Sequence, residues 1–459
     1  MKMTEEDKGK AWPQIVAILL GCLISLQNGL HFGWTSPFFV ELTNDKEHYD
    51  ITEEQASVFT TLPPIVTILS CPLVTWMCNA VGRKTTLLAG AVPFILSWVL
   101  EVFATDVYTF YIARALTGLG TSASTASLSM YIGEIATPEI RSFWGNFLSI
   151  FLGLGQFMIN LIGFHFSVSQ ASYICLVPAF LFVFTFPLMP ESPYYLLMKG
   201  KEDGAKRSLK KLTRKKDIEV DFEQLKTDVN RQMSDRGNWG DLVFILANRK
   251  ALTAGILMRC AQMFCGASAF PAYTRYIFEK AVGDSETSTL VFSGVMVIMT
   301  LLAGFTIDRL GRKKSFVISM CLSIVCLLFL SIFYYIEEFQ PQVDISNLLW
   351  MPVAGMVAYM TFSSFGVVNV PTIMLGELFS ASIKAKGLTV LLCVMGLMIS
   401  LTNYLFFWLN VSYGMFCPFL VFAIVSTVLT VLCFYMIPET KCKTLEEIQQ
   451  ILGGNVQCK

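Results

Sequence analysis

Charged side chains are scarce in this sequence. Asp, Glu, Lys and Arg make up only 15% of the 459 residues, whereas soluble domains carry about 25%. The 34 basic and 34 acidic residues balance, so the net charge predicts no nucleic-acid partner. Only three histidines are present, and no Ser/His/Asp set, metal-ligand spacing or Gly-rich phosphate loop occurs. We therefore expect neither an enzyme nor a bound metal or cofactor.

Cysteines at paired, metal-binding spacings are also lacking, although thirteen cysteines are present. Most of them lie inside apolar runs, as Cys22, Cys175 and Cys260 do. Cysteines in such surroundings act as small hydrophobic side chains. We therefore expect no disulfide framework.

Apolar residues dominate instead, at 54% of the chain. A bilayer core about 30 Å thick requires about 20 apolar residues in a helix. Twelve runs of that kind occur in two groups of six, which predicts an all-α membrane protein with twelve transmembrane helices in two halves. The runs are Pro13–Phe32, Val58–Cys78, Leu87–Phe103, Val107–Ile132, Trp144–Phe164 and Ala171–Met189, then Leu252–Phe278, Thr289–Ile307, Phe316–Ile336, Leu348–Leu375, Leu388–Leu409 and Tyr413–Met436.

The basic residues predict the orientation. With the N-terminus inside, 29 of the 34 Lys and Arg residues lie on the cytosolic side and three in external loops, which is the positive-inside pattern. We therefore expect both termini in the cytosol. The predicted domains are a cytosolic tail (1–12), a six-helix bundle (13–189), a cytosolic linker (190–250), a second six-helix bundle (251–437) and a second cytosolic tail (438–459).

Short cytosolic helices are predicted outside the membrane. In the polar linker Phe222, Leu225 and Val229 recur at helical spacing. In the C-terminal tail a capping box from Thr444 to Glu447 predicts a helix with Leu445, Ile448, Ile451 and Leu452 on one face.

Three charged markers recur in order in the two halves. Gly82-Arg83-Lys84 matches Gly311-Arg312-Lys313, Glu134 with Arg141 matches Glu377 with Lys384, and Pro190-Glu191 matches Pro438-Glu439. The offsets are 229, 243 and 248 residues, which indicates a duplication.

These charges are predicted to lie at the cytosolic helix ends, where they can pair across helices. Our hypothesis is a gate that forms when the cytosolic side closes and breaks when it opens. The alternative is that they are ordinary juxtamembrane charges that set topology. The candidate gate residues are Arg83, Arg114, Glu134, Arg141, Glu191, Asp308, Arg312, Glu377, Lys384 and Glu439.

Together these motifs resemble the sugar porter family of the major facilitator superfamily. The resemblance rests on the glycine-arginine-lysine markers, Arg114 with Gly118 and Gly120, YIGEIATPEIR (131–141), PESPYYL (190–196), Gln262 with Gly266, GELFS (376–380) and PETK (438–441). It spans almost the whole chain and implies the major facilitator fold. GWTSP (33–37) and the short tails look most like the branch of insect facilitated trehalose transporters.

The chain departs from the family at positions that contact sugar in relatives. The second glutamine of span seven is Met263, the tryptophan of span ten is Thr372 and the glutamine of span five is Ser149. Some of the side chains that contact hexose in the family are therefore missing, so the resemblance does not identify the substrate.

A sugar site inside a membrane needs neutral hydrogen-bonding groups and aromatic rings. For most polar residues inside spans, a structural bond between helices is an equally good explanation; Gln262 and Ser268 match family positions most directly. The candidate substrate-binding residues are Gln27, Thr35, Ser149, Gln262, Ser268, Tyr273, Asn369, Thr372 and Asn403.

Proton-driven relatives carry an acidic residue in span one, and this chain has none there. We therefore expect passive uniport of a sugar such as trehalose or a hexose by alternating access. Glu101 in span three is the only rival coupling group. Arg259, one turn before Gln262, either has a carboxylate or backbone partner or contacts an anionic substrate. Asn410 begins a glycosylation sequon in a very short outer loop.

Two other functions remain open at this point. One is a non-transporting sugar sensor, and the other is a transporter of a different, possibly anionic, solute. In every case the expected partners are a small solute and the lipid bilayer. We expect a monomer, located in the plasma membrane.

Overall fold

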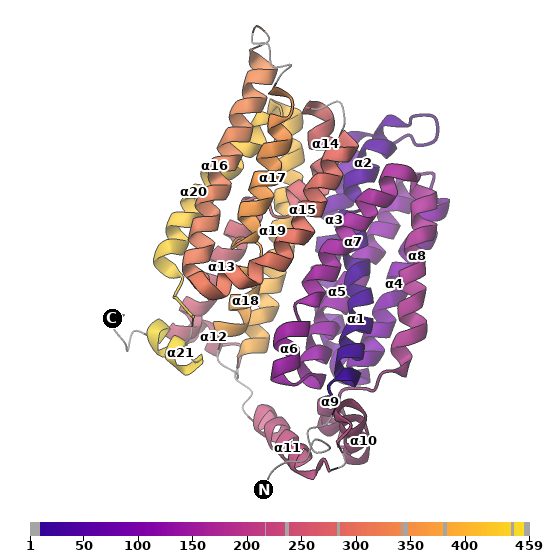
Figure 1. Ribbon diagram of the computed structural model, residues 1–459, viewed down its shortest axis with the longest axis vertical. Coiled ribbons are helices and arrows are strands. Elements are labelled where there is room, and N and C mark those ends of the chain that lie inside the picture. Colours follow the sequence, from indigo (N-terminus) through magenta and orange to yellow (C-terminus); the bar gives the residue numbers. More distant parts are fainter. Residues whose placement is uncertain are drawn as a thin grey trace. The chain divides into compact units, whose positions relative to one another are not determined.

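The computed structural model describes residues 10–215, 217–234, 238–281, 285–340, 342, 348–379, 383–441 and 445–453. Every regular element in these ranges is a helix (Figure 1). A helix satisfies its backbone hydrogen bonds internally, which the hydrocarbon core of a membrane requires. The all-α prediction is confirmed.

Nine helical segments in the described ranges are long and apolar enough to cross a membrane. They match nine of the twelve predicted runs. The other three runs also form helices, but one carries Arg114 among many small polar residues and two are each divided by a short break. These nine segments are Trp12–Asn44, Glu53–Val81, Arg83–Phe103, Phe147–His165, Val168–Leu188, Ser285–Ala303, Arg312–Phe339, Lys386–Tyr413 and Phe416–Met436.

The chain divides into two compact units, and each is described separately. Unit 1 comprises Met1–Phe32 and Ile65–Arg236, and unit 2 comprises Gly33–Pro64 and Gly237–Lys459. This division differs from the predicted domain bounds at two places. The predicted linker 190–250 is divided between the units after Arg236. The segment Gly33–Pro64 was expected in the first bundle, and it belongs to unit 2.

Unit 1 is built around α4, which packs against α5 and α8. An apolar core that includes Phe94, Tyr131 and Phe182 holds these helices together. The helices of this unit are α1 (Trp12–Gly33), the later part of α3 (Glu53–Val81), α4 (Arg83–Phe103), α5 (Val107–Ile135), α6 (Pro138–Trp144), α7 (Phe147–His165), α8 (Val168–Thr185), η2 (Phe186–Leu188), α9 (Pro193–Met198), α10 (Glu202–Thr213) and α11 (Glu219–Ser234).

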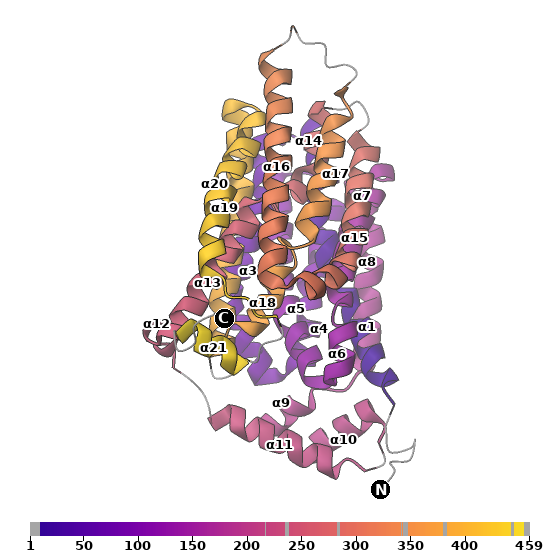
Figure 2. The same ribbon diagram turned by 60° about the vertical axis from the view of Figure 1, so that its left-hand side comes forward.

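The linker helices α9, α10 and α11 lie at one end of unit 1 (Figure 2). Phe222 and Val229 of α11 are buried, which confirms the predicted amphipathic helix. Lys226 of α11 forms an ion pair with Glu202 of α10 at 2.7 Å. The charges therefore join the two linker helices to one another.

In unit 2, α16 packs against α17 and α20, while α13 packs against α19 and α20. The elements are α2 (Thr35–Asn44), the first part of α3, α12 (Asp241–Phe244), α13 (Leu246–Phe264), α14 (Ala269–Ala281), α15 (Ser285–Leu310), α16 (Arg312–Phe339), α17 (Met351–Ser364), α18 (Val370–Glu377), α19 (Lys384–Tyr413), α20 (Phe416–Met436) and α21 (Leu445–Gly453). The tail helix α21 packs on α13 and buries Ile448 and Leu452, as its sequence predicts. Thr444 of the predicted capping box lies outside the described residues.

Candidate functional site

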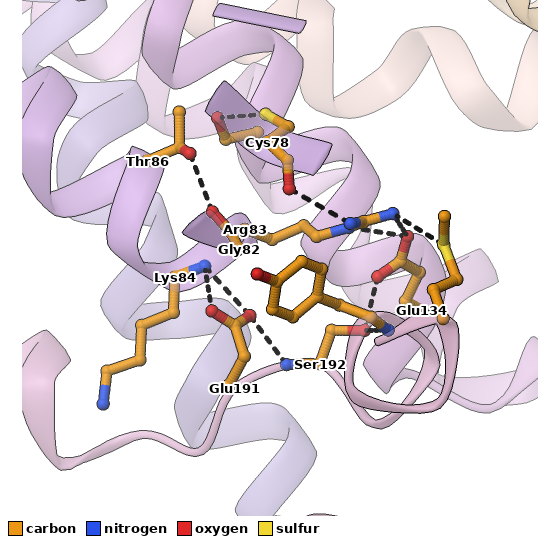
Figure 3. Close-up of polar contacts among 11 residues, drawn as sticks. Cys78, Gly82, Arg83, Lys84, Thr86, Glu134, Glu191 and Ser192 are labelled. Atoms are coloured by element: carbon orange, nitrogen blue, oxygen red, sulfur yellow. Dashed lines mark hydrogen bonds and ion pairs between the residues drawn. The ribbon is translucent and has the colours of Figure 1, made fainter. Parts of the chain in front are cut away.

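The first charged cluster of unit 1 centres on Arg83, at the start of α4. Its Nε donates to Glu134 Oε1 at 3.0 Å, and its Nη2 lies 2.9 Å from the same oxygen. The other Glu134 oxygen accepts a hydrogen bond from the Ser192 hydroxyl. Arg83 is buried and Glu134 is largely buried, so this ion pair is better shielded from water than a surface pair. Figure 3 shows the Arg83 side chain reaching the Glu134 carboxylate.

Glu191 has a different role from the one predicted. Its carboxylate accepts hydrogen bonds from the backbone N–H of Lys84 at 3.1 and 3.2 Å (Figure 3). It also accepts from the backbone N–H of Ser192 at 2.8 Å. A carboxylate at a helix N-terminus is stabilised by free N–H groups and by the helix dipole. Glu191 therefore caps α4 and bonds the backbone instead of a guanidinium.

Unit 2 repeats this arrangement with the second set of markers. Arg312 Nη2 lies 3.4 Å from Glu377 Oε1, and the Thr440 hydroxyl donates to the other Glu377 oxygen. Glu439 accepts from the backbone N–H of Arg312 at 3.0 Å and of Lys313 at 3.2 Å. Glu439 therefore caps α16 as Glu191 caps α4.

Glycine is required at the start of both capped helices. The φ angle is 109° at Gly82 and 93° at Gly311, a region that strongly favours glycine. A Cβ atom at Gly82 would lie 2.3 Å from Glu191 Oε2, and one at Gly311 would lie 2.9 Å from Glu439 Oε2. The glycines thus let each capping carboxylate approach the backbone.

The remaining predicted gate residues lie outside these clusters or are not described. Arg141 is exposed, and its Nη1 donates to the Gly133 carbonyl at 3.2 Å. Arg114 lies within α5, where it pairs with Glu101. The side chains of Asp308 and Lys384 lie outside the described residues. Within unit 1 the structure thus brings together Arg83 and Glu134, with Glu191 beside them.

The ion pair of Glu101 and Arg114 is fully buried, with 0% and 1% of the side chains exposed. Ser97 donates to Glu101 Oε1 at 3.2 Å, and Arg114 Nη1 donates to the His31 carbonyl at 3.2 Å. The His31 ring stacks on Trp98 with centroids 4.0 Å apart. Glu101, the rival coupling group, is therefore a paired carboxylate.

Within unit 2, the segment Gly33–Pro64 is attached to α14 and α19 by side-chain hydrogen bonds. The Tyr273 hydroxyl lies 3.0 Å from Thr60 Oγ1. Asn403 Nδ2 donates to the Thr60 carbonyl at 3.3 Å, while Asn403 Oδ1 accepts from Ser268 Oγ at 3.0 Å. Three predicted substrate residues thus meet here, and all three make bonds inside the unit.

More polar contacts extend this attachment. Ser400 Oγ donates to the Thr61 carbonyl at 3.0 Å, and Tyr276 donates to Glu53 Oε2 at 3.1 Å. Arg275 Nη1 donates to the Pro37 carbonyl at 3.2 Å. Buried polar side chains and main-chain atoms make most of these bonds, and Phe39 packs against Tyr273 and Tyr276 beside them.

The Asn410 amide also belongs to this region. It is buried, and its Nδ2 donates to the Tyr276 hydroxyl at 3.0 Å inside α19. A glycan cannot be attached to this amide in the folded chain.

Three predicted substrate-binding residues lie in the first half of the sequence. Gln27 donates to the Cys175 carbonyl at 2.9 Å and accepts from Trp98 Nε1 at 2.8 Å, so its amide joins α1 to α8 and α4. Thr35 is buried at the start of α2. Ser149 of α7 is exposed.

The two broken spans of unit 2 meet at Gln262. Its Nε2 donates to the Val368 carbonyl at 2.9 Å, and Val368 lies in the break between α17 and α18. Asn369 donates to the Ser364 carbonyl at 2.8 Å, while Thr372 is exposed. Broken helices expose polar backbone groups inside a membrane bundle and form substrate sites in transporters.

Sequence reasoning missed three amides in unit 1. Asn28 is buried and bonds Ser124 through Nδ2 at 2.7 Å. Gln156 and Asn160 of α7 are also buried. The Oδ1 atoms of Asn28 and Asn160 have no partner among the residues that the structure describes. Their polarity inside apolar runs, the same signal that identified Gln27, could have found them.

Relatives of similar sequence carry one recurring name. The chain is 28% identical to "Facilitated trehalose transporter Tret1" of Anopheles gambiae, with 99% of this chain and 59% of the relative covered. It is 28% identical to that of Aedes aegypti, with 97% and 56% covered. The transporter of the same name from Culex quinquefasciatus is 29% identical, with 99% of this chain and 88% of the relative covered. The chain thus spans little more than half of the first two relatives.

Solved structures share the fold. The inward open conformation of the xylose transporter XylE from E. coli superposes with a TM-score of 0.78 at 19% identity, covering 95% of this chain and 99% of that one. XylE bound to 6-bromo-6-deoxy-D-glucose gives a TM-score of 0.73 at 20% identity, covering 95% and 99%. This second structure is described as a member of the major facilitator superfamily, so the predicted fold is confirmed.

The model of the family described as "Sugar (and other) transporter" matches residues 17–452, nearly the whole chain. This match agrees with the duplicated clusters and the broken spans described above. The chain therefore belongs to the sugar transporter family.

Proposed function

We propose that this protein carries a sugar across a membrane by facilitated diffusion, through alternating access. The observation that carries the proposal is the pair of broken spans at Gln262, because broken helices place hydrogen-bonding groups in the membrane interior, where a solute can use them. Family membership and the names of the relatives agree with this function. We expect trehalose or a hexose to be the first solutes to test.

The proposed gating rests on contacts that can be exchanged. The segment Gly33–Pro64 is attached to α14 and α19 through hydrogen bonds of Tyr273, Asn403 and Ser400. In our proposal these bonds close the external side and break when that side opens. The charged clusters at Arg83 and Arg312 would act at the cytosolic side, where we propose that both termini lie because of the excess of basic residues.

The proposed transport is passive. Span one has no acidic residue, and the Glu101 carboxylate is held in an ion pair with Arg114. A proton-coupled carrier needs a group that gains and loses its proton during the cycle. We therefore propose a uniporter in the plasma membrane.

Proteoliposomes test this proposal. We expect purified protein to exchange labelled trehalose or glucose for unlabelled sugar, with no dependence on a pH gradient. Uptake that acidifies the lumen would contradict the passive mechanism. Saturable sugar binding without any exchange would instead indicate a sensor.

A further inference from the structure

Arg259 of α13 is a buried cation that has no acidic partner among the described residues. Only 3% of its surface is exposed. Its Nη1 donates to Gln262 Oε1 at 2.7 Å, and its Nε is buried with no partner in the described part of the chain. Within the described parts of unit 2, the ion pairs formed by arginines join Arg275 to Glu286 and Arg312 to Glu377, and none includes Arg259.

The contrast with Arg114 shows what is missing. Arg114 is equally buried, and Glu101 neutralises its charge. A guanidinium inside a membrane is costly and normally faces a carboxylate, backbone carbonyls or a functional ligand. Arg259 has one amide oxygen for five N–H donors. Most of its hydrogen-bonding capacity and all of its charge thus remain available.

The position of Arg259 is that of a ligand-binding residue. It lies one turn before Gln262, which bonds the break between α17 and α18 through the Val368 carbonyl. Its own helix ends at Phe264, and α14 begins at Ala269. The N-termini of α14 and α18 therefore begin close in sequence to these groups, and helix N-termini favour negative charge. The C-termini of α13 and α17 lie at the same two breaks, so the helix dipoles oppose one another there and Arg259 supplies the full positive charge.

We propose that Arg259 binds the anionic group of the solute, so that the accepted sugar carries a carboxylate, as a hexuronate does. One guanidinium matches one carboxylate in charge and in its paired N–H donors. A phosphate dianion would leave a negative charge unmatched beside a single cation. This inference rests on the proposed sugar transport and narrows its substrate class.

Glucuronate and glucose form a matched pair of probes, because they differ only in the carboxylate at C6. We expect the protein in proteoliposomes to exchange glucuronate faster than glucose. Arg259→Gln should lower glucuronate exchange by at least about tenfold, since a hydrogen-bonded charge is lost, while Arg259→Lys should retain part of it. Arg249→Gln, which changes an exposed arginine of the same helix, should leave exchange unchanged.

Thermal unfolding gives a second readout that does not require transport. Glucuronate should raise the Tm of the unaltered protein and of Arg249→Gln, but not of Arg259→Gln. Arg259→Gln removes an uncompensated buried charge, so this variant should fold. A Tm that rises with sodium chloride but not with glucuronate would assign an inorganic counter-ion to Arg259 and overturn the inference.

The two proposals fail differently. Exchange of glucose or trehalose without glucuronate, or full glucuronate exchange by Arg259→Gln, overturns the anionic substrate and leaves sugar transport standing. No exchange and no stabilisation by any of the three sugars overturns both.

Discussion

The two buried arginines inside the spans differ in one respect that governs their energetics. Arg114 faces the Glu101 carboxylate, while among the residues described Arg259 bonds the Gln262 amide and no carboxylate. A buried ion pair is sensitive to the loss of one partner, because the remaining charge stays desolvated. An unpaired cation instead gains stability when an anion arrives. The first is a structural element of unit 1, and the second is our candidate for substrate recognition.

Replacing Glu101 by Gln should destabilise the protein, because Arg114 then stays buried without a counter-charge. Breaking such a pair costs about 3–5 kcal/mol, so we expect a clearly lower Tm in thermal unfolding. The double change Glu101→Gln with Arg114→Gln should recover part of the loss. A double variant that is less stable than the single one would show that the charge pair is not the cause.

Replacing Gly82 by Ala should also destabilise the protein. The φ of 109° and the Cβ position 2.3 Å from Glu191 Oε2 exclude a side chain, and such backbone strain costs about 1–3 kcal/mol. Gly133→Ala is the matched control, because no atom lies within 4 Å of its Cβ position in helix α5. We expect Gly133→Ala to keep or raise the Tm. An equal fall in Tm in both variants would show that strain at Gly82 is not the cause.

At the scale of elements, the spans compared in the two units differ in whether the helix is interrupted. The spans of unit 1 that contain α4 and α5 run without interruption, whereas two spans of unit 2 are divided into α13 with α14 and α17 with α18. Divided helices can bend at the break with little loss of packing. The attachment of Gly33–Pro64 involves α14, the second piece of one divided span. Movement of α14 would therefore release this segment.

Tyr273→Phe tests that attachment, because it removes the hydroxyl that bonds Thr60. A lost hydrogen bond of this kind is worth about 0.5–1.5 kcal/mol, so amide exchange in residues 33–64 should become about three- to tenfold faster. Hydrogen-exchange mass spectrometry measures this. Tyr404→Phe, at an exposed position on α19, should leave exchange unchanged. Equal protection in both variants would show that the bond does not hold the segment.

At the scale of the whole molecule, duplication is visible in the geometry as well as in the spacing of motifs. In each unit a glycine with positive φ starts a helix, a glutamate caps it, and the following arginine pairs with a second glutamate. The hydroxyl that binds the second glutamate comes from Ser192 in one unit and Thr440 in the other. The same arrangement of glycine, capping glutamate and ion pair thus occurs at the corresponding helix start in each unit.

Equivalent capping roles predict equivalent losses. Glu191→Gln and Glu439→Gln should each lower stability by about 1–2 kcal/mol, because each removes a charged acceptor from a helix N-terminus. Differential scanning fluorimetry of the two variants checks this. Glu202→Gln, in an exposed ion pair with Lys226, should have little effect. A loss confined to one of the two capping variants would contradict equivalent roles.

The sequence alone determined the all-α membrane fold, the twelve runs and the duplication, because hydrophobic length and motif spacing are properties of the linear chain. It also predicted that the repeated acidic and basic residues pair across helix ends, and Arg83 with Glu134 is one such pair in the structure. The partners of individual polar groups were decided only by tertiary structure. Glu191 caps a helix, Gln27 joins helices, and Arg259 bonds an amide with no carboxylate from the described residues beside it. Each outcome depends on which side chains distant in sequence occupy the space around the group.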